Sequence, residues 1–460
     1  MAHNLIARNI DSFNPQNRLA ALADILRDLN LQPNASAGPG RLVPGLINMH
    51  IHSFYSYNAR GYSPAHIALE CRRNNFYAAG LCDFDVLDGL EEFFTAGEKL
   101  GLRVAVHLET RAFLREYAEM DINSPGEPGV AYIMGAGFGS LPPGNSPAGE
   151  FLRELRRRAN ARNRALVGRI NARLPEIMID YDAQVLPLSP GGCPTERHIV
   201  QAYRAKAQDV FADREKLTAF WSKLMRKTAP ETAALLNDPP VMDDKIRSLL
   251  AKSGGIGYAQ PDEKTFPPAD DFIRWVLQCG AVPMATWLDG TSRGETNMLK
   301  ILECLQAKGA AALNIIPDRN HNIKNQDERR VKLQKLNEVI SAARKLQFPV
   351  NIGTEMNKNG QLFADDLDCA ALADYRHDFL EGAAIMVGQG VLTRYAGFSY
   401  CGPSAQSEFG RDTARKNRFF AQAGNLPPLS VRQADCLRNM PREKAFLAIR
   451  DSANQGKWQV

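Results

Sequence analysis

The sequence lacks the features that would assign it to a membrane or disulfide-stabilised class. It contains no apolar run of about 18 residues, so no membrane-spanning segment is predicted. Residues 1–16 include Asp11 and lack the apolar stretch of a secretory signal. The eight cysteines form no Cys-x-x-Cys pair and are predicted to be reduced residues rather than a disulfide framework or a zinc ribbon. These absences favour a cytoplasmic protein.

Composition adds little beyond a globular class. The chain has 460 residues, of which 44% are hydrophobic, and this is enough for one large core with additions. The formal net charge of +5 is modest, so overall charge does not indicate a polyanion-binding protein.

Seven short apolar runs are predicted to be buried parallel strands. They cover residues 42–47, 78–82, 102–106, 130–134, 281–285, 312–316 and 348–353. Helical patterns, such as those of residues 90–100 and 332–346, separate most of these runs. This alternation predicts an α/β fold, a parallel β/α barrel, whose chemistry lies at the C-terminal ends of the strands.

Most of the runs lead to polar side chains, and the most informative follow the first run. Asn48-Met49-His50-Ile51-His52 places two imidazoles two residues apart. Residues at this spacing share one face of a strand, so both rings can converge on one metal ion. The alternative is a packed or surface histidine pair. The other runs lead to Asp83 and Asp85, His107 and Glu109, Gly135, Thr286, Asp318 and His321, and Glu355 and Asn357.

These motifs resemble those of the polymerase and histidinol phosphatase (PHP) family of metal-dependent phosphoesterases. The resemblance rests on His50-Ile51-His52-Ser53, Tyr62-Ser63-Pro64, the segment from Cys82 to Gly89, Glu109, Ala285-Thr286-Trp287 and the segment from Gly353 to Asn357. It implies a distorted, seven-stranded, TIM-like β/α barrel with a helical insertion, over residues 41–400.

The resemblance also implies a metal site. Mapped onto the family's ligand positions, the residues that surround one ion are His50, His52, Glu109 and Glu355. Phe84, Thr286 and Asn357 stand where the family has further histidine ligands, and Asn48 stands for an aspartate. One divalent transition metal, zinc, manganese or iron, is therefore expected. Glu355 replaces a shorter aspartate, so either the strand end adjusts or Glu355 is not a ligand.

Two further groups of residues are candidates for catalysis and substrate binding. His107 and Asp83 are placed to act as an acid or base, although His107 has the alternative of a hydrogen-bonded histidine low in the barrel. Cationic or polar side chains in the strand-end loops are candidates to bind phosphate, with solvated surface charges as the alternative. They are Arg111, Arg319, His321 and Lys358.

The chain is predicted to have five parts. Residues 1–40 form a helical arm (19–31) and a linker (33–40), and residues 41–145 form the first part of the barrel. Residues 146–264 form a helical insertion that acts as a lid. Residues 265–403 complete the barrel, and residues 404–460 form a helical tail with a break at Pro427-Pro428.

The insertion opens with an arginine-rich helical pattern. Arginines occur at positions 153, 156, 157, 158, 162, 164, 169 and 173, beside an apolar stripe. Such a helix, Arg153 to Arg173, is a candidate contact for nucleic-acid phosphates. The alternative is a solvated helix whose arginines pair with Glu150, Glu154 and Glu176.

The sequence therefore favours a metal-dependent hydrolase of phosphate esters that uses a metal-activated water. Nucleotides, sugar phosphates and oligonucleotides are the expected substrates. One alternative is a PHP-like pseudoenzyme that binds or assembles with other molecules. Another is a metal enzyme that acts on a sugar or carboxylic acid. No membrane partner is expected, and association into a homo-oligomer stays open.

Overall fold

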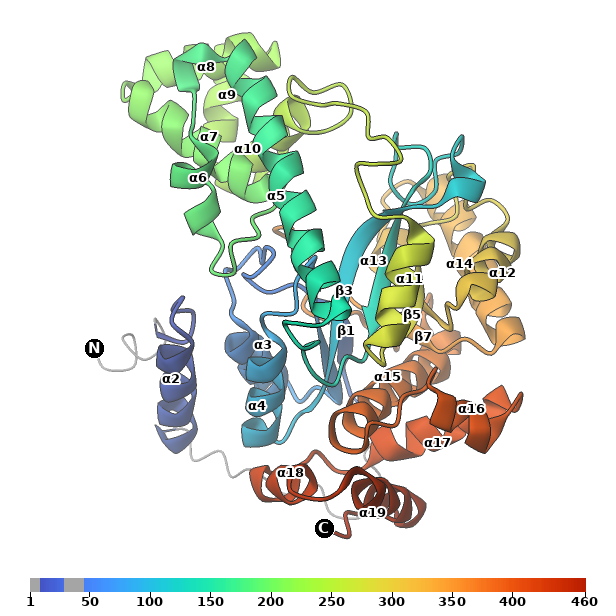
Figure 1. Ribbon diagram of the computed structural model, residues 1–460. Helices are drawn as coiled ribbons and strands as arrows, with labels where there is room; N and C mark the ends of the chain where they lie inside the picture. Colours follow the sequence, from blue (N-terminus) through green and yellow to red (C-terminus); the bar gives the residue numbers. More distant parts are fainter. Residues whose placement is uncertain (1–8, 29–44) are drawn as a thin grey trace.

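A seven-stranded sheet curves into a nearly closed barrel at the centre of the protein (Figure 1). The computed structural model describes residues 9–28 and 45–460. The strands follow one another in the sheet in chain order. They are β1 (Ile47–Ile51), β2 (Ala78–Phe84), β3 (Arg103–Phe113), β4 (Val130–Ala136), β5 (Val282–Trp287), β6 (Ala312–Ile315) and β7 (Val350–Ile352). The predicted seven-stranded α/β barrel is confirmed.

The barrel closes between β1 and β7. The backbone N–H of His52 donates to the carbonyl of Glu355 at 2.9 Å, and the Glu355 N–H donates to the carbonyl of His50 at 2.8 Å. The Asn48 amide donates to Thr354 Oγ1 at 2.7 Å, and Asn48 Oδ1 accepts from the Thr354 N–H at 3.2 Å. Closure therefore occurs at the residues in which the sequence places the metal site.

Strand β4 does not have the predicted direction. It runs antiparallel to both β3 and β5, whereas all other neighbouring strands are parallel. Residues 114–129 contain only a short 3₁₀ turn and no crossover helix, so β3 and β4 pair as a long hairpin. As a result, His107 and Glu109 lie within β3 rather than beyond its end.

Helices cover the outer face of the barrel. They are α3 (Pro64–Arg73), α4 (Leu90–Leu100), α11 (Ala269–Gln278), α12 (Met298–Lys308) and α14 (Gln326–Leu346), and the short α13 (Asp318–His321) follows the end of β6. The predicted helix 90–100 coincides with α4, and the predicted helix 332–346 is the second part of α14. Of the helices in the described part of the chain, none has the length and apolar character needed to cross a membrane.

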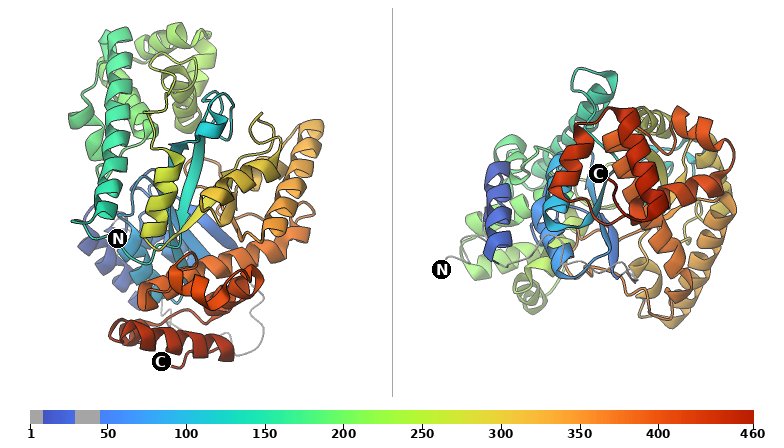
Figure 2. Two further views of the ribbon diagram at one scale, coloured as in Figure 1. Left: turned by 45° about the vertical axis from the view of Figure 1, so that its right-hand side comes forward. Right: turned by 90° about the horizontal axis from the view of Figure 1, so that it is seen from below.

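Helix α15 (Arg376–Val391) closes the N-terminal end of most barrel strands. Its Gln389 amide donates to the carbonyls of Gly137, after β4, and Gly280, before β5. Its Gly382 packs so closely on Val350 that an added Cβ would lie 2.0 Å from the Val350 carbonyl oxygen. The helices that follow lie on the same side (Figure 2). They are α16 (Pro403–Phe409), α17 (Thr413–Asn425), α18 (Val431–Arg438) and α19 (Arg442–Gln455), and Pro427-Pro428 separates α17 from α18.

The helices between β4 and α11 lie toward the opposite end of the barrel (Figure 1). They are α5 (Pro147–Arg173), α6 (Tyr181–Gln184), α7 (Glu196–Val210), α8 (Arg214–Met225), α9 (Ala229–Leu236) and α10 (Pro239–Leu250). They share a hydrophobic cluster of their own, in which Ile170, Tyr203 and Trp221 are fully buried. We call helices α5–α10 the helical insertion.

The N-terminal helix α2 (Pro15–Asp28) packs beside α3 and α4. Its buried Arg18 pairs with Glu92 of α4, with Nε lying 2.9 Å from Oε1. The predicted helix 19–31 overlaps α2, but its residues 29–31 and the predicted linker 33–40 lie outside the described residues.

We expect Gly353→Ala to destabilise the barrel closure. An added Cβ would lie 2.5 Å from Asn48 Oδ1 and from His50 Cβ, so β7 would have to move away from β1. The free energy of unfolding, measured with urea, should fall by about 1–3 kcal/mol. Gly168→Ala in α5 is the control, since nothing lies within 4 Å of its Cβ position. Equal stability of wild type and Gly353→Ala would contradict the expectation.

Candidate metal centre

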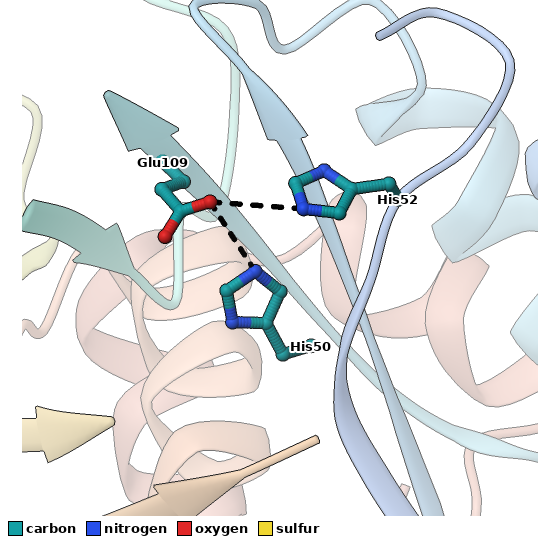
Figure 3. Close-up of side chains that lie close together, drawn as sticks. All are labelled: His50, His52 and Glu109. Atoms are coloured by element: carbon teal, nitrogen blue, oxygen red, sulfur yellow. Dashed lines mark ion pairs between the residues drawn. The ribbon is translucent and has the colours of Figure 1, made fainter. Parts of the chain in front are cut away.

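Three side chains from β1, its end and β3 converge inside the barrel (Figure 3). Glu109 Oε2 lies 3.5 Å from His50 Nε2 and 3.6 Å from His52 Nε2. One donor atom from each residue lies within 4.8 Å of the others. Two ligands of a tetrahedral ion with bonds of about 2.1 Å are about 3.4 Å apart, so this spacing suits a shared metal ion better than a hydrogen bond.

The converging atoms are buried and have no hydrogen-bond partner. Glu109 is 4% exposed and both histidines are fully buried. The unpartnered atoms include His50 Nε2, His52 Nε2 and Glu109 Oε2. Buried polar atoms without partners are costly and uncommon in folded proteins. The two imidazole nitrogens and the carboxylate oxygen therefore fit a transition-metal ion such as zinc, manganese or iron.

A hydrogen-bond chain orients His52. The Ser56 hydroxyl donates to Asp83 Oδ1 at 2.7 Å and lies 3.3 Å from His52 Nδ1. Because the hydroxyl proton points to Asp83, His52 Nδ1 must supply the proton to Ser56, which leaves the Nε2 lone pair facing Glu109. Burial and the neighbouring His50 lower the pKa of His52 well below its ordinary value. A neutral imidazole in this tautomer is the form that binds metals.

His50 has a different electrostatic environment. Burial opposes a charge on its ring, but the neighbouring Cys82 and Glu109 outweigh burial and raise the pKa of His50. A proton on His50 must leave when an ion binds, so metal affinity should fall as the solution is acidified.

Two residues at positions where the PHP resemblance would place histidine ligands have packing or hydrogen-bonding roles instead. The Phe84 ring stacks on His52, with centroids 4.5 Å apart and planes 17° from parallel. Thr286 Oγ1 donates to the Tyr132 carbonyl at 2.6 Å and accepts from Asn123 Nδ2 at 2.8 Å. Phe84 and Thr286 therefore contribute to packing and hydrogen bonding around the barrel and offer no metal ligand beside His50, His52 and Glu109.

The structure does not bring Glu355 into the converging group. Arg319 Nη2 lies 3.0 and 2.9 Å from the two Glu355 carboxylate oxygens, and Gln361 Nε2 donates to Oε2 at 3.1 Å. Burial alone would raise the pKa of Glu355, but the charges of Arg319 and the nearby histidines lower it to about 2. Glu355 is therefore an ion-pair partner here, because Arg319 occupies its carboxylate.

The two candidate acid–base residues lie close to the group but have other contacts. His107 Nδ1 accepts from the Gly137 N–H at 3.1 Å, and burial together with His50 lowers the pKa of His107 to about 3. Asp83 accepts from the Ser53 N–H at 2.7 Å and from the Ser53 hydroxyl at 2.6 Å. Burial raises the pKa of Asp83 to about 6 against these hydrogen bonds. The hydrogen bonds of His107 and Asp83 indicate that both residues support the structure around His50, His52 and Glu109.

The candidate phosphate-binding residues other than Arg319 each have a partner away from the converging group. Arg111 pairs with Glu127 at 2.8 Å, and its guanidinium lies 4.3 Å from the Phe266 ring centroid. Lys358 Nζ lies 3.5 Å from Asp244 of the helical insertion. His321 lies beside Asp365, with Nε2 3.6 Å from Oδ1.

Arg197, at the start of α7, is a neighbour of the site that the sequence analysis did not identify. Its charge contributes to the lowered pKa of His52. It pairs with Asp244 at 3.2 Å and lies over the Tyr57 ring, 5.5 Å from the centroid. No local pattern indicates this placement, because it depends on how the helical insertion packs on the barrel.

The arginines of α5 mostly form ion pairs within the chain. The pairs are Arg153–Glu150, Arg156–Asp88, Arg157–Glu154, Arg158–Glu154, Arg162–Asp85 and Arg164–Asp182. Those with Asp85 and Asp88 connect α5 to the loop after β2. Contact of this helix with nucleic acid stays a prediction.

Comparison with known proteins finds several similar solved structures, and two of them are given below. No family model matches the chain, and the comparison with curated proteins found no match. An amidohydrolase from Chromobacterium violaceum, with bound sulfate and no metal, is 16% identical, with a TM-score of 0.45 over 69% of this chain and 89% of that chain. A protein described as a metal-dependent phosphoesterase from Bifidobacterium adolescentis is 16% identical, with a TM-score of 0.46 over 74% and 98%. These values do not assign an activity.

The arrangement predicts different effects for the two glutamates. Glu109→Gln should abolish tight metal binding, because an amide oxygen is a weak ligand for a transition ion. Glu355→Gln should keep metal occupancy close to that of the wild type. Elemental analysis of the dialysed proteins measures both. Loss of metal in Glu355→Gln with retention in Glu109→Gln would reverse the assignment.

The pH dependence of stability tests the ion pair of Glu355 with Arg319. The pKa of Glu355 in the folded protein, about 2, lies below its ordinary value of 4.5. The pair therefore contributes stability that is present above about pH 4.5 and is lost as the pH falls toward 2. Urea denaturation should give a constant difference between wild type and Glu355→Gln from pH 7 to 5 and a smaller one at pH 3.5. A difference that grows on acidification would contradict the pairing.

Proposed function

We propose that this protein is a metal-dependent hydrolase of phosphate esters, with a nucleotide, a sugar phosphate or an oligonucleotide as substrate. The observation that carries the proposal is the buried, unpartnered convergence of His50, His52 and Glu109 at the spacing of metal ligands. A metal ion held there would polarise a phosphoryl oxygen and acidify a water molecule.

The surrounding residues have roles that support this chemistry. Asp83, through Ser56, keeps His52 in the tautomer that binds metal. Arg319 pairs with Glu355 and is close enough to Glu109 to influence its pKa. Arg319 and Arg197 therefore place guanidinium groups near the site, and a phosphate ester would bind them by replacing their partners Glu355 and Asp244. Because Arg197 belongs to the helical insertion, we assign the insertion the role of a lid over the bound substrate.

A second candidate function is binding without catalysis. Phe84 and Thr286 have taken packing and hydrogen-bonding roles at former ligand positions, and Glu355 is held by Arg319. The pKa of His107, about 3, also makes it a weak base near neutral pH. A protein that binds a metal and a phosphorylated ligand without turnover would have these features.

Activity measurements distinguish the two functions. The double variant His50→Ala with His52→Ala should lower hydrolysis of a phosphomonoester or phosphodiester by at least about 100-fold, because loss of the ion removes several kcal/mol of transition-state stabilisation. The matched control is His377→Ala, which changes an exposed histidine of α15. Initial rates with a nucleotide, a sugar phosphate and an aryl phosphate provide the measurement.

The fold of each variant is checked by circular dichroism and urea denaturation. A folded, fully metallated wild type that hydrolyses none of these substrates, but binds one of them, would favour the binding function. Unchanged rates in the double variant would exclude the proposed site.

A further inference from the structure

A second group of possible metal ligands lies at the end of β6. Asp318 and His321 come from the short helix α13, and Asp365 comes from the loop after β7. One donor atom from each lies within 4.8 Å of the others. None of these residues belongs to the first group of His50, His52 and Glu109. We propose that Asp318, His321 and Asp365 bind a second divalent cation.

Asp365 provides the main evidence. Its side chain is 1% exposed, and neither carboxylate oxygen has a hydrogen-bond partner. His321 Nε2 lies 3.6 Å from Asp365 Oδ1, beyond hydrogen-bond distance, and is itself unpartnered. A buried carboxylate without donors is among the costliest arrangements in a protein, and it points to a missing partner.

The charges in the group favour a cation over a water molecule as that partner. Two carboxylates, of Asp318 and Asp365, face one imidazole. A water molecule would supply hydrogen bonds but would leave the two negative charges to repel each other. A divalent cation supplies the opposite charge and can also accept a lone pair from a ring nitrogen of His321. Two oxygen donors and one nitrogen suit manganese in particular, with zinc as a competitor.

Other contacts hold the ligands in position. Arg329 of α14 donates to the His321 carbonyl at 2.8 Å, and Asn322 Nδ2 donates to Asp318 Oδ1 at 2.9 Å. The loop that carries Asp365 is tied to β1, since Asn48 Nδ2 donates to the Phe363 carbonyl at 3.0 Å. Contacts of this kind fix the orientation of metal ligands before the ion binds.

The position of Arg319 suggests what the second cation does. Arg319 lies between Asp318 and His321 in the sequence of α13 and pairs with Glu355 beside the first group. A cation that joins α13 to the loop after β7 would fix the backbone from which Arg319 extends. The second site is therefore a structural site that positions Arg319, and it does not need a substrate.

Manganese binding tests this proposal. Full-length protein is stripped with a chelator, titrated with MnCl₂, and the bound ion is counted by electron paramagnetic resonance. The wild type should bind two ions per chain, and the His50→Ala with His52→Ala variant should bind one. Adding Asp365→Asn to that variant should weaken the remaining binding by more than about 100-fold, since changes around ligands alone cost about 10–100-fold.

Matched variants make the result specific. Asp366→Asn, at the exposed neighbour of Asp365, is the control and should not change the number of ions. If Asp365→Asn does not fold, His321→Gln replaces it. Absence of manganese binding to the folded His50→Ala with His52→Ala variant would overturn the proposal, as would equal binding after Asp365→Asn. If only the proposed site at His50, His52 and Glu109 were wrong, the wild type would bind one ion instead of two, and the double variant would still bind one. This result differs from the one expected if the second site were wrong, so the two cases are distinguishable.

Discussion

Closure of the barrel between β1 and β7 sets the positions of the histidines on which the site depends. Asn48 stands where an aspartate is expected from the PHP resemblance, and its amide explains how the closure works. It donates to Thr354 Oγ1 and the Phe363 carbonyl, while its oxygen accepts from the backbone N–H groups of Thr354 and His50. An ionised aspartate at this position could accept from the two backbone N–H groups, but it could not donate to Thr354 Oγ1 or to the Phe363 carbonyl. Asn48 therefore stabilises the strand from which His50 extends.

The residues around the site form structural contacts at positions where the PHP resemblance would place ligands. Phe84 packs on His52, Thr286 bonds across the rim, and Glu355 pairs with Arg319. The contacts of Thr286 and Glu355 satisfy polar groups without an ion, and the Phe84 ring offers no ligand atom, so few ligands remain near the first group. His50, His52 and Glu109 are the exception, because their facing atoms have no alternative partner. This contrast is the physical reason to place an ion at that group.

Sequence reasoning predicted the features that depend on local patterns. Strands β2 to β7, the helix at residues 90–100 and the alternation that directs His50 and His52 to one side follow from local patterns. The first strand was placed too early, because β1 (Ile47–Ile51) begins at the last residue of the predicted run 42–47 and contains His50 itself. Features that depend on tertiary packing could not be predicted in this way. The direction of β4 depends on a hairpin connection without a crossover helix. The ion pair between Glu355 and Arg319 and the close approach of His321 to Asp365 both depend on the position of α13.

The central claim is that His50, His52 and Glu109 share one metal ion. The most direct test is a crystal grown with manganese or zinc and measured at the absorption edge of that metal. We predict an anomalous peak about 2.0–2.2 Å from His50 Nε2, His52 Nε2 and Glu109. A fully occupied crystal with no peak between these three side chains, or with the side chains turned away from one another, would contradict the account.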